Sequence, residues 1–150
     1  QARPEKARKF GIDVLNHAVD GVEGETAVHI CFGYAAIIHE RPEGYSFLPE
    51  FSGCSVDSIS IETAQSGLDC TILKSLPDKR IILGVLDLSK QEVEAAETVA
   101  KRIRRALPYC AAERLIIAPD CGLKYLPREV AFGKVQAMVA GADVVRRELG

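Results

Sequence analysis

Four short apolar runs, rich in β-branched residues, recur along the chain and constrain its fold more than any other feature. They cover residues 26–33, 55–63, 80–88 and 114–121. Runs of this length and composition are typical of buried strands. Their starts lie about 25 to 34 residues apart, a spacing that suits a series of β-α units.

Helical patterns fill the segments before, between and after these runs. The longer ones place apolar residues at helical spacing over residues 4–20, 91–107 and 127–149. In the first of them the predicted apolar face holds Phe10, Val14 and Ala18. Ser89 is the predicted N-cap of the second, with Glu92 as its capping-box partner. Shorter helical segments are expected near residues 45–51 and 68–76.

The alternation of continuous apolar strands with helices predicts an α/β fold, in which helices cover a parallel sheet. Four β-α units suit two architectures, a small doubly wound sheet or half of an eight-stranded (β/α)8 TIM-type barrel. A complete barrel needs roughly 250 residues, and the chain has 150. The polar residues near the strand ends decide between the two architectures.

Polar side chains gather at the carboxyl ends of the predicted strands. His29 and Cys31 share one face of the first strand, because side chains alternate along a strand. Glu62 lies at the end of the second strand, where a buried carboxylate is costly unless it is paired or bound to a metal. Cys121 follows Asp120 at the end of the fourth strand. Because β/α barrels build their active sites from these strand ends, the pattern favours the barrel and predicts a zinc site.

Each of these residues also has an ordinary structural explanation. A single histidine is more often a hydrogen-bonded core residue, a single cysteine more often packs in the core, and Glu62 alone would suit a loop or a helix cap. The shared position at equivalent strand ends favours the metal site over these separate explanations. The other histidines and cysteines lack that position, and we expect surface or packing roles for His17, His39, Cys54, Cys70 and Cys110.

The composition excludes several other classes of protein. The net charge is −2 and the pI about 6.0, whereas nucleic-acid-binding domains usually carry a basic patch and a high pI. No apolar run in the sequence approaches the roughly 20 residues of a membrane span. The chain has five cysteines and no signal-peptide pattern at its start, which argues against a disulfide framework and for a reducing cytoplasm. Its first residues already have a helical pattern, so we expect the chain to begin inside a larger protein.

Three stretches of the sequence are similar to one known family. Residues 29–31, 59–63 and 119–124 resemble the C-terminal catalytic barrel of cobalamin-independent methionine synthase, and residues 84–87 fit the same pattern. The superfamily also contains the zinc-dependent epoxyalkane:coenzyme M transferase. The resemblance covers nearly the whole chain. It implies that residues 1–150 are the C-terminal half of a (β/α)8 barrel, with four parallel β-α units and an incomplete N-terminal side.

The resemblance also implies the chemistry of the site. The family's Zn²⁺ ligands match four positions here, His29, Cys31, Glu62 and Cys121. A free thiol has a pKa of about 8.5, and binding to a metal deprotonates it, so zinc would activate homocysteine for methylation to methionine. Glu62 is expected to give way when the substrate sulfur arrives. Asp120 is expected either to orient His29 or a substrate amine, as a catalytic residue, or only to cap a loop.

One position departs from the family's pattern. In the long methionine synthases a histidine follows the aspartate of the strand that corresponds to residues 80–88, and it is thought to protonate the folate leaving group. Ser89 stands at or near that position and cannot act as a comparable acid at neutral pH. This difference favours a short family member that uses a methyl or alkyl donor other than folate.

Three functions are therefore open. They are zinc-dependent methyl transfer to homocysteine, zinc-dependent alkyl transfer to another thiol such as coenzyme M, and a non-catalytic half-barrel that needs a partner chain. The partners in the first two are small molecules, a thiol and an alkyl donor, with no nucleic acid or membrane. A half-barrel exposes two sheet edges and apolar surface, so we expect this chain to complete its barrel with a missing N-terminal half or with another chain.

Overall fold

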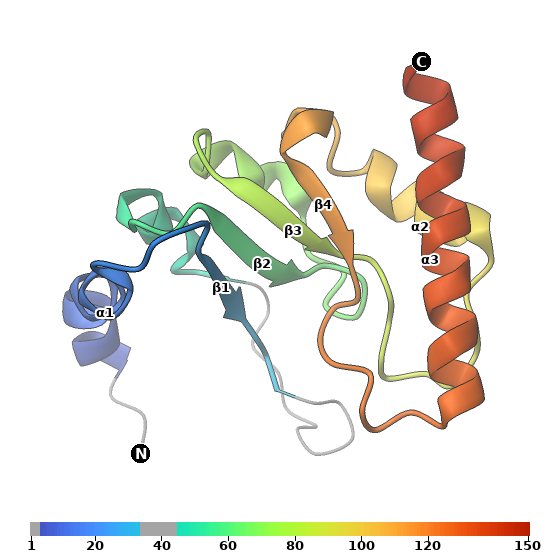
Figure 1. The fold of residues 1–150 in the computed structure, drawn as a ribbon, viewed down its shortest axis with the longest axis horizontal. Coiled ribbons are helices and arrows are strands. Elements are labelled where there is room, and N and C mark those ends of the chain that lie inside the picture. Colours follow the sequence, from blue (N-terminus) through green and yellow to red (C-terminus); the bar gives the residue numbers. More distant parts are fainter. Residues whose placement is uncertain (1–3, 34–44) are drawn as a thin grey trace.

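The strands and helices follow one another as expected of β-α units (Figure 1). The structure, a computed structural model, describes residues 4–33 and 45–150. Its helices and strands are α1 Pro4–Val19, β1 Ala27–Ile30, β2 Ser58–Glu62, β3 Arg80–Gly84, α2 Ala96–Arg104, β4 Leu115–Ala118 and α3 Arg128–Leu149. The short helical segments are 3₁₀ helices, at Leu48–Gly53, Cys70–Ser75 and Ala112–Arg114. The strands end before the predicted apolar runs do, so residues 31–33, 85–88 and 119–121 lie in loops.

All four strands are parallel and pair in the order β1-β2-β3-β4. A doubly wound sheet reverses its strand order at a switch point, whereas consecutive strands of a β/α barrel stay in sequence order. The α/β class and the barrel-like arrangement predicted from the sequence are therefore confirmed. At the carboxyl ends, Glu62 of β2 pairs with Gly84 of β3, and Gly84 pairs in turn with Ala118 of β4.

The two faces of the sheet carry different side chains. On one face the central strands contribute side chains with no exposed surface to the core beneath the helices, at Ile59, Ile61, Ile81 and Leu83. Because side chains alternate along a strand, the opposite face of β2 carries Ser58, Ser60 and Glu62. The polar face is the one on which the predicted ligands lie.

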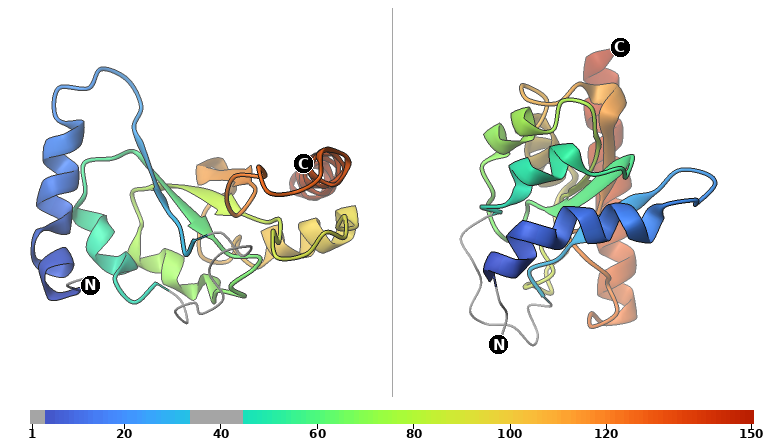
Figure 2. Two further views of the ribbon diagram at one scale, coloured as in Figure 1. Left: turned by 90° about the horizontal axis from the view of Figure 1, so that it is seen from below. Right: turned by 90° about the vertical axis from the view of Figure 1, so that its left-hand side faces the viewer.

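Helices flank both edges of the sheet. α1 lies on the β1 side of the sheet and contacts the 3₁₀ helix Leu48–Gly53, whereas α2 and α3 pack on each other beyond β4 on the other side (Figures 1 and 2). Within the described residues, β1 and β4 each pair with a strand on one side only. Across the same part of the chain, no helix has the length and apolar character needed to cross a membrane.

The buried face of α1 differs from the predicted one. Phe10 and Val14 are 47% and 65% exposed, and Ile12, Leu15 and Val19 pack against the core instead. The helix has apolar residues on more than one side, and only one side of an edge helix contacts the rest of the chain. Spacing alone could not identify which side that would be.

The predicted start of α2 is wrong, and so is the predicted capping box. The helix begins at Ala96, and its N-cap residue Ala95 makes no side-chain cap bond. Ser89 instead donates its N–H and its hydroxyl to Asp87 Oδ1, at 2.9 and 2.6 Å. The residues between β3 and α2 form a loop because tertiary hydrogen bonds outweigh their helix propensity.

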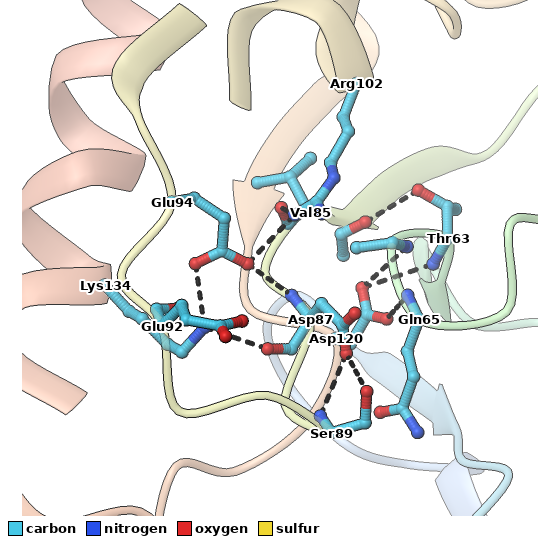
Figure 3. Close-up of polar contacts among 12 residues, drawn as sticks. Thr63, Gln65, Val85, Asp87, Ser89, Glu92, Glu94, Arg102, Asp120 and Lys134 are labelled. Carbon is cyan, nitrogen blue, oxygen red and sulfur yellow. Dashed lines mark hydrogen bonds and ion pairs between the residues drawn. The ribbon is translucent and has the colours of Figure 1, made fainter. Parts of the chain in front are cut away.

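A buried lysine makes several of those tertiary bonds (Figure 3). Lys134 of α3 has no exposed surface, and its Nζ donates to the carbonyl oxygens of Asp87 and Glu92 at 3.0 and 2.7 Å. It also pairs with Glu94 Oε2 at 2.8 Å. Glu94 Oε1 lies 3.0 Å from Arg102 Nη1 and accepts the Asp87 N–H at 2.8 Å. Buried charges are tolerated when they are paired and hydrogen-bonded, so this network fixes the loop after β3 to α3.

Candidate metal centre

Four side chains from three strand ends converge at the carboxyl edge of the sheet. His29 lies in β1, and Cys31 directly follows that strand. Glu62 is the last residue of β2, and Cys121 lies in the loop after β4. One potential ligand atom of each residue lies within 4.8 Å of those of all the others. The structure thus brings together all four residues that the sequence singled out as metal ligands.

The separation of the two thiols is suitable for a shared metal ion. Cys31 Sγ and Cys121 Sγ lie 3.5 Å apart, and both cysteines are free. Tetrahedral zinc, with bonds of about 2.0–2.3 Å, keeps its ligand atoms roughly 3.3–3.8 Å from one another. The two sulfurs lie within that range. The 4.8 Å limit for the whole group exceeds it by about 1 Å, which small side-chain rotations would close.

The electrostatics of the group favour a cation. Partial burial of the sulfur and then the nearby Glu62 carboxylate raise the pKa of Cys31 to about 12, although the Gly33 N–H donates to that sulfur at 3.1 Å. The residue as a whole is exposed on the open face of the sheet. Glu62 is 1% exposed, and its Oε1 accepts the Phe32 N–H at 3.2 Å. A metal ion would stabilise the buried carboxylate, and it would lower the pKa of the neighbouring Cys31 thiol.

His29 has a hydrogen-bond partner that would set its tautomer. Its Nδ1 lies 2.8 Å from Ser60 Oγ, on the neighbouring strand. If the serine hydroxyl accepts the Nδ1 proton, the lone pair of the neutral ring lies on Nε2. Histidines that bind metals almost always have such a partner on their other ring nitrogen.

Tyr45 connects the ends of β1 and β2, and the sequence did not single it out. Its hydroxyl donates to the Ile30 carbonyl at 2.9 Å and accepts the Glu62 N–H at 2.8 Å. Its ring stacks on Phe32, with ring centroids 4.2 Å apart. Burial is the main cause that raises its pKa above the ordinary value, so the hydroxyl keeps its proton. No local pattern marks this residue, because its two partners lie 15 and 17 residues away in sequence.

Asp120 is 1% exposed and connects β4 to the loop that follows β2 (Figure 3). Its carboxylate accepts three backbone N–H groups at 3.3, 3.1 and 2.7 Å, from Thr63, Ala64 and Gln65. Burial raises the pKa of Asp120 to about 7, although these hydrogen bonds act in the opposite direction. These hydrogen bonds are those of a residue that caps the loop after β2. A catalytic role, in which Asp120 orients His29 or a substrate amine, stays a prediction.

The other histidines and cysteines lie outside the group of four. His17 is exposed, as expected of a surface residue, and His39 falls outside the described residues. The remaining cysteines are buried and free, at Cys54, Cys70 and Cys110. Burial raises the pKa of Cys70 and Cys110, which suits packing rather than reactivity.

The sequence matches a known catalytic domain. Residues 7–144 match the sequence model described as the catalytic domain of cobalamin-independent synthase. The chain belongs to the cobalamin-independent methionine synthase family. The resemblance expected from residues 29–31, 59–63 and 119–124 is thereby confirmed.

Individual family members show how much of the fold is shared. The methionine synthases of Thermococcus kodakarensis and Saccharolobus solfataricus are 36% and 38% identical to this chain, over 141 and 143 residues. Each match covers 93% of this chain but only 39% and 40% of the relative. The solved B12-independent methionine synthase from Shewanella sp. W3-18-1, in complex with selenomethionine, superposes with a TM-score of 0.85 at 30% identity. That match covers 97% of this chain and 45% of the other, so the four strands are part of a barrel.

Proposed function

We propose that this chain carries the zinc-binding part of a methionine synthase and acts in methyl transfer to the thiol of homocysteine. The observation that carries the proposal is the convergence of four potential ligand atoms within 4.8 Å, from His29, Cys31, Glu62 and Cys121. The relatives support it, because they are methionine synthases and the Shewanella structure contains selenomethionine, an analogue of the product. The chain spans 39–40% of the curated relatives, so the activity of the whole enzyme belongs to the proposal.

The donor set suits zinc better than a hard cation. Two thiolates, an imidazole and a carboxylate are common ligands of tetrahedral zinc, whereas magnesium and calcium prefer sites made only of oxygen. Bound zinc would keep a substrate thiol deprotonated at neutral pH and so supply the nucleophile. All five cysteines are free, which suits the cytoplasmic setting that we predict.

The residues of the chain have separate tasks in this reaction. The substrate thiol loses its proton, its sulfur forms a bond to the methyl carbon, and the bond from that carbon to the donor breaks with its electron pair on the donor. Glu62 is the catalytic carboxylate that we expect to give way to the substrate sulfur. Tyr45 holds the backbone at the end of β2. The Phe32 N–H is a hydrogen-bond donor that keeps the Glu62 carboxylate close to the site. Asp120 was expected to orient His29 or the substrate amine. The catalytic task that we propose for it is to orient the substrate amine, because His29 Nδ1 is paired with Ser60 and Nε2 is left for the metal.

The methyl donor is proposed to differ from the folate of the long enzymes. Ser89, at or near the family's histidine position, is exposed and donates its hydroxyl to Asp87 Oδ1 at 2.6 Å. A serine hydroxyl in that bond cannot protonate a folate leaving group. This observation supports a donor that needs no such acid.

A thiol alkylation assay tests the proposal without knowledge of the natural donor. Methyl iodide serves as a simple methyl donor, and homocysteine and coenzyme M are supplied separately as acceptors to the zinc-loaded chain. We expect faster methylation of homocysteine than in buffer, with no acceleration by Cys121→Ser. Faster methylation of coenzyme M than of homocysteine would instead support transfer to another thiol. If the chain binds zinc but accelerates neither reaction, the result would contradict the proposal that this chain catalyses the transfer without a partner chain.

The edges of the sheet favour a second candidate function, that of a non-catalytic half-barrel that needs a partner chain. Within the described residues β1 and β4 each lack a neighbouring strand on one side. Large apolar side chains are also exposed on the flanking helices, with Val14 of α1 at 65% and Phe132 of α3 at 63%. Gel filtration of the zinc-loaded chain discriminates, because a catalytically active monomer would show that no partner is required.

A further inference from the structure

Gly84 of β3 lies between β2, which ends at Glu62, and β4, which leads to Cys121, and no side chain fits at its position. It pairs directly with Glu62 on β2 and with Ala118 on β4. A Cβ atom at this position would lie 2.4 Å from Asp120 Oδ1, 2.7 Å from Asp120 Cα and 2.8 Å from the Ile61 carbonyl oxygen. Two of these three atoms belong to the backbone and cannot move aside by rotation of a side chain.

The space above Gly84 is occupied by the carboxylate of Asp120. That carboxylate reaches across β3 and accepts the N–H groups of residues 63–65. Beside it, the Thr63 hydroxyl donates to the Gly84 carbonyl at 2.7 Å. The end of β2 is therefore bonded both to β3 and, through Asp120, to the loop after β4 (Figure 3).

This connection directly adjoins two of the proposed zinc ligands. Thr63 follows Glu62 in sequence, and Asp120 precedes Cys121. We infer that Asp120, lying in the space left by Gly84, is a positioning residue that fixes Glu62 and Cys121 at the mutual distance a metal ion requires. The inference rests on the proposed zinc site. Gly84 is needed because, without a Cβ atom, it leaves space for the Asp120 carboxylate.

The expected effect of breaking the connection is a loss of metal affinity in a protein that still folds. Removing outer-shell partners of metal ligands typically weakens metal binding roughly 10- to 100-fold. Gly84→Ala displaces the Asp120 carboxylate by steric conflict. Asp120→Asn keeps the shape of the side chain but replaces one acceptor oxygen with an NH₂ group, which cannot accept a backbone N–H.

The chain offers two matched glycine controls. Gly141, where α3 meets α2, is as crowded as Gly84, since a Cβ atom there would lie 2.5 Å from Val99 Cβ and 2.7 Å from the Ala96 carbonyl oxygen. Gly141→Ala therefore introduces similar strain away from the ligands. Gly53 has no atom within 4 Å of its added Cβ, so Gly53→Ala controls for the substitution itself.

The experiment measures the Zn²⁺ dissociation constant of the full chain and its variants by competition with a chromophoric chelator, and records the visible spectrum of the Co²⁺-loaded forms. Circular dichroism selects the variants that fold. We expect Gly84→Ala and Asp120→Asn to bind Zn²⁺ roughly 10- to 100-fold more weakly with altered Co²⁺ spectra, and both controls to match the wild type. Wild-type affinity in folded Asp120→Asn would overturn the inference, as would an equal loss in Gly141→Ala. Failure of the wild type to bind either metal would instead overturn the proposed function.

Discussion

Replacing Lys134 by methionine tests whether the buried charge network stabilises the fold. Methionine approximates the length and volume of the lysine stem but lacks the ammonium group. The substitution removes the pairing with Glu94 Oε2 at 2.8 Å and the donors to the Asp87 and Glu92 carbonyls. Lys134 has no exposed surface, so water cannot replace these bonds without a rearrangement.

The expected loss of stability can be worked from those contacts. Removing one partner of a buried ion pair typically costs about 3–5 kcal/mol. Arg102 still lies 3.0 Å from Glu94 Oε1, so the remaining carboxylate keeps a cation and we expect a loss near the lower end, about 3 kcal/mol. That loss is a large part of the roughly 5–15 kcal/mol by which native proteins are stable.

Urea unfolding of the metal-free chain, followed by circular dichroism, measures this loss. Lys101→Met is a matched control, because Lys101 is exposed on α2 and its substitution should leave the unfolding midpoint unchanged. The double variant with Glu94→Gln should recover part of the loss, since it removes the uncompensated charge. A loss below about 1 kcal/mol in Lys134→Met, within the range of exposed ion pairs, would refute the reasoning.

Three further predictions concern other parts of the structure. Burial alone would raise the pKa of Glu94, but hydrogen bonds from Lys134, the Asp87 N–H and Arg102 lower it below 4.5. The ionised Glu94 should therefore stabilise the fold above pH 4.5, and this stabilisation should be lost as the pH falls further. An acid titration monitored by circular dichroism should show a smaller loss in Glu94→Gln, and an identical curve would contradict the assignment. Tyr45→Phe removes the hydroxyl that bonds the Ile30 carbonyl and the Glu62 N–H, and it should cost about 1–3 kcal/mol in urea unfolding. An unchanged midpoint would contradict a stabilising role of the hydroxyl. Val139→Lys, at a side chain that is 52% exposed on α3, should raise the monomer fraction in sedimentation velocity if that face associates. An unchanged monomer fraction would contradict association through this face of α3.

The cluster of candidate ligands could be predicted from the sequence because its position depends on two simple rules. Side chains alternate along a strand, which places His29 and Cys31 on one face, and parallel strands bring their carboxyl ends to one edge of the sheet. Cys31 and Cys121 lie in loops, one and three residues beyond the ends of their strands, so the strand ends still determine roughly where they lie. The two rules were sufficient to predict that Glu62 and Cys121 lie near His29 and Cys31. In the structure, potential ligand atoms of the four residues lie within 4.8 Å of one another.

The connections that surround the cluster could not be predicted in the same way. Tyr45 and Asp120 act through backbone groups far away in sequence, and the N–H partners of Asp120 lie 55 to 57 residues from it. Their roles depend on how loops fold over the strand ends, which no periodic pattern encodes. The prediction of where α2 begins was wrong for a related reason. Lys134 of the distant helix α3 donates a hydrogen bond to the loop after β3, and the sequence of that loop does not show this.

Metal content is the measurement that tests the central claim most directly. The chain is purified in its folded form, and its zinc is quantified by elemental analysis beside that of Cys121→Ser. The account predicts about one zinc per wild-type chain, as expected of a single tetrahedral site, and loss of that zinc in the variant. A folded wild-type chain that neither retains zinc nor takes it up on addition would contradict the account, and so would a Cys121→Ser variant that binds zinc as tightly as the wild type.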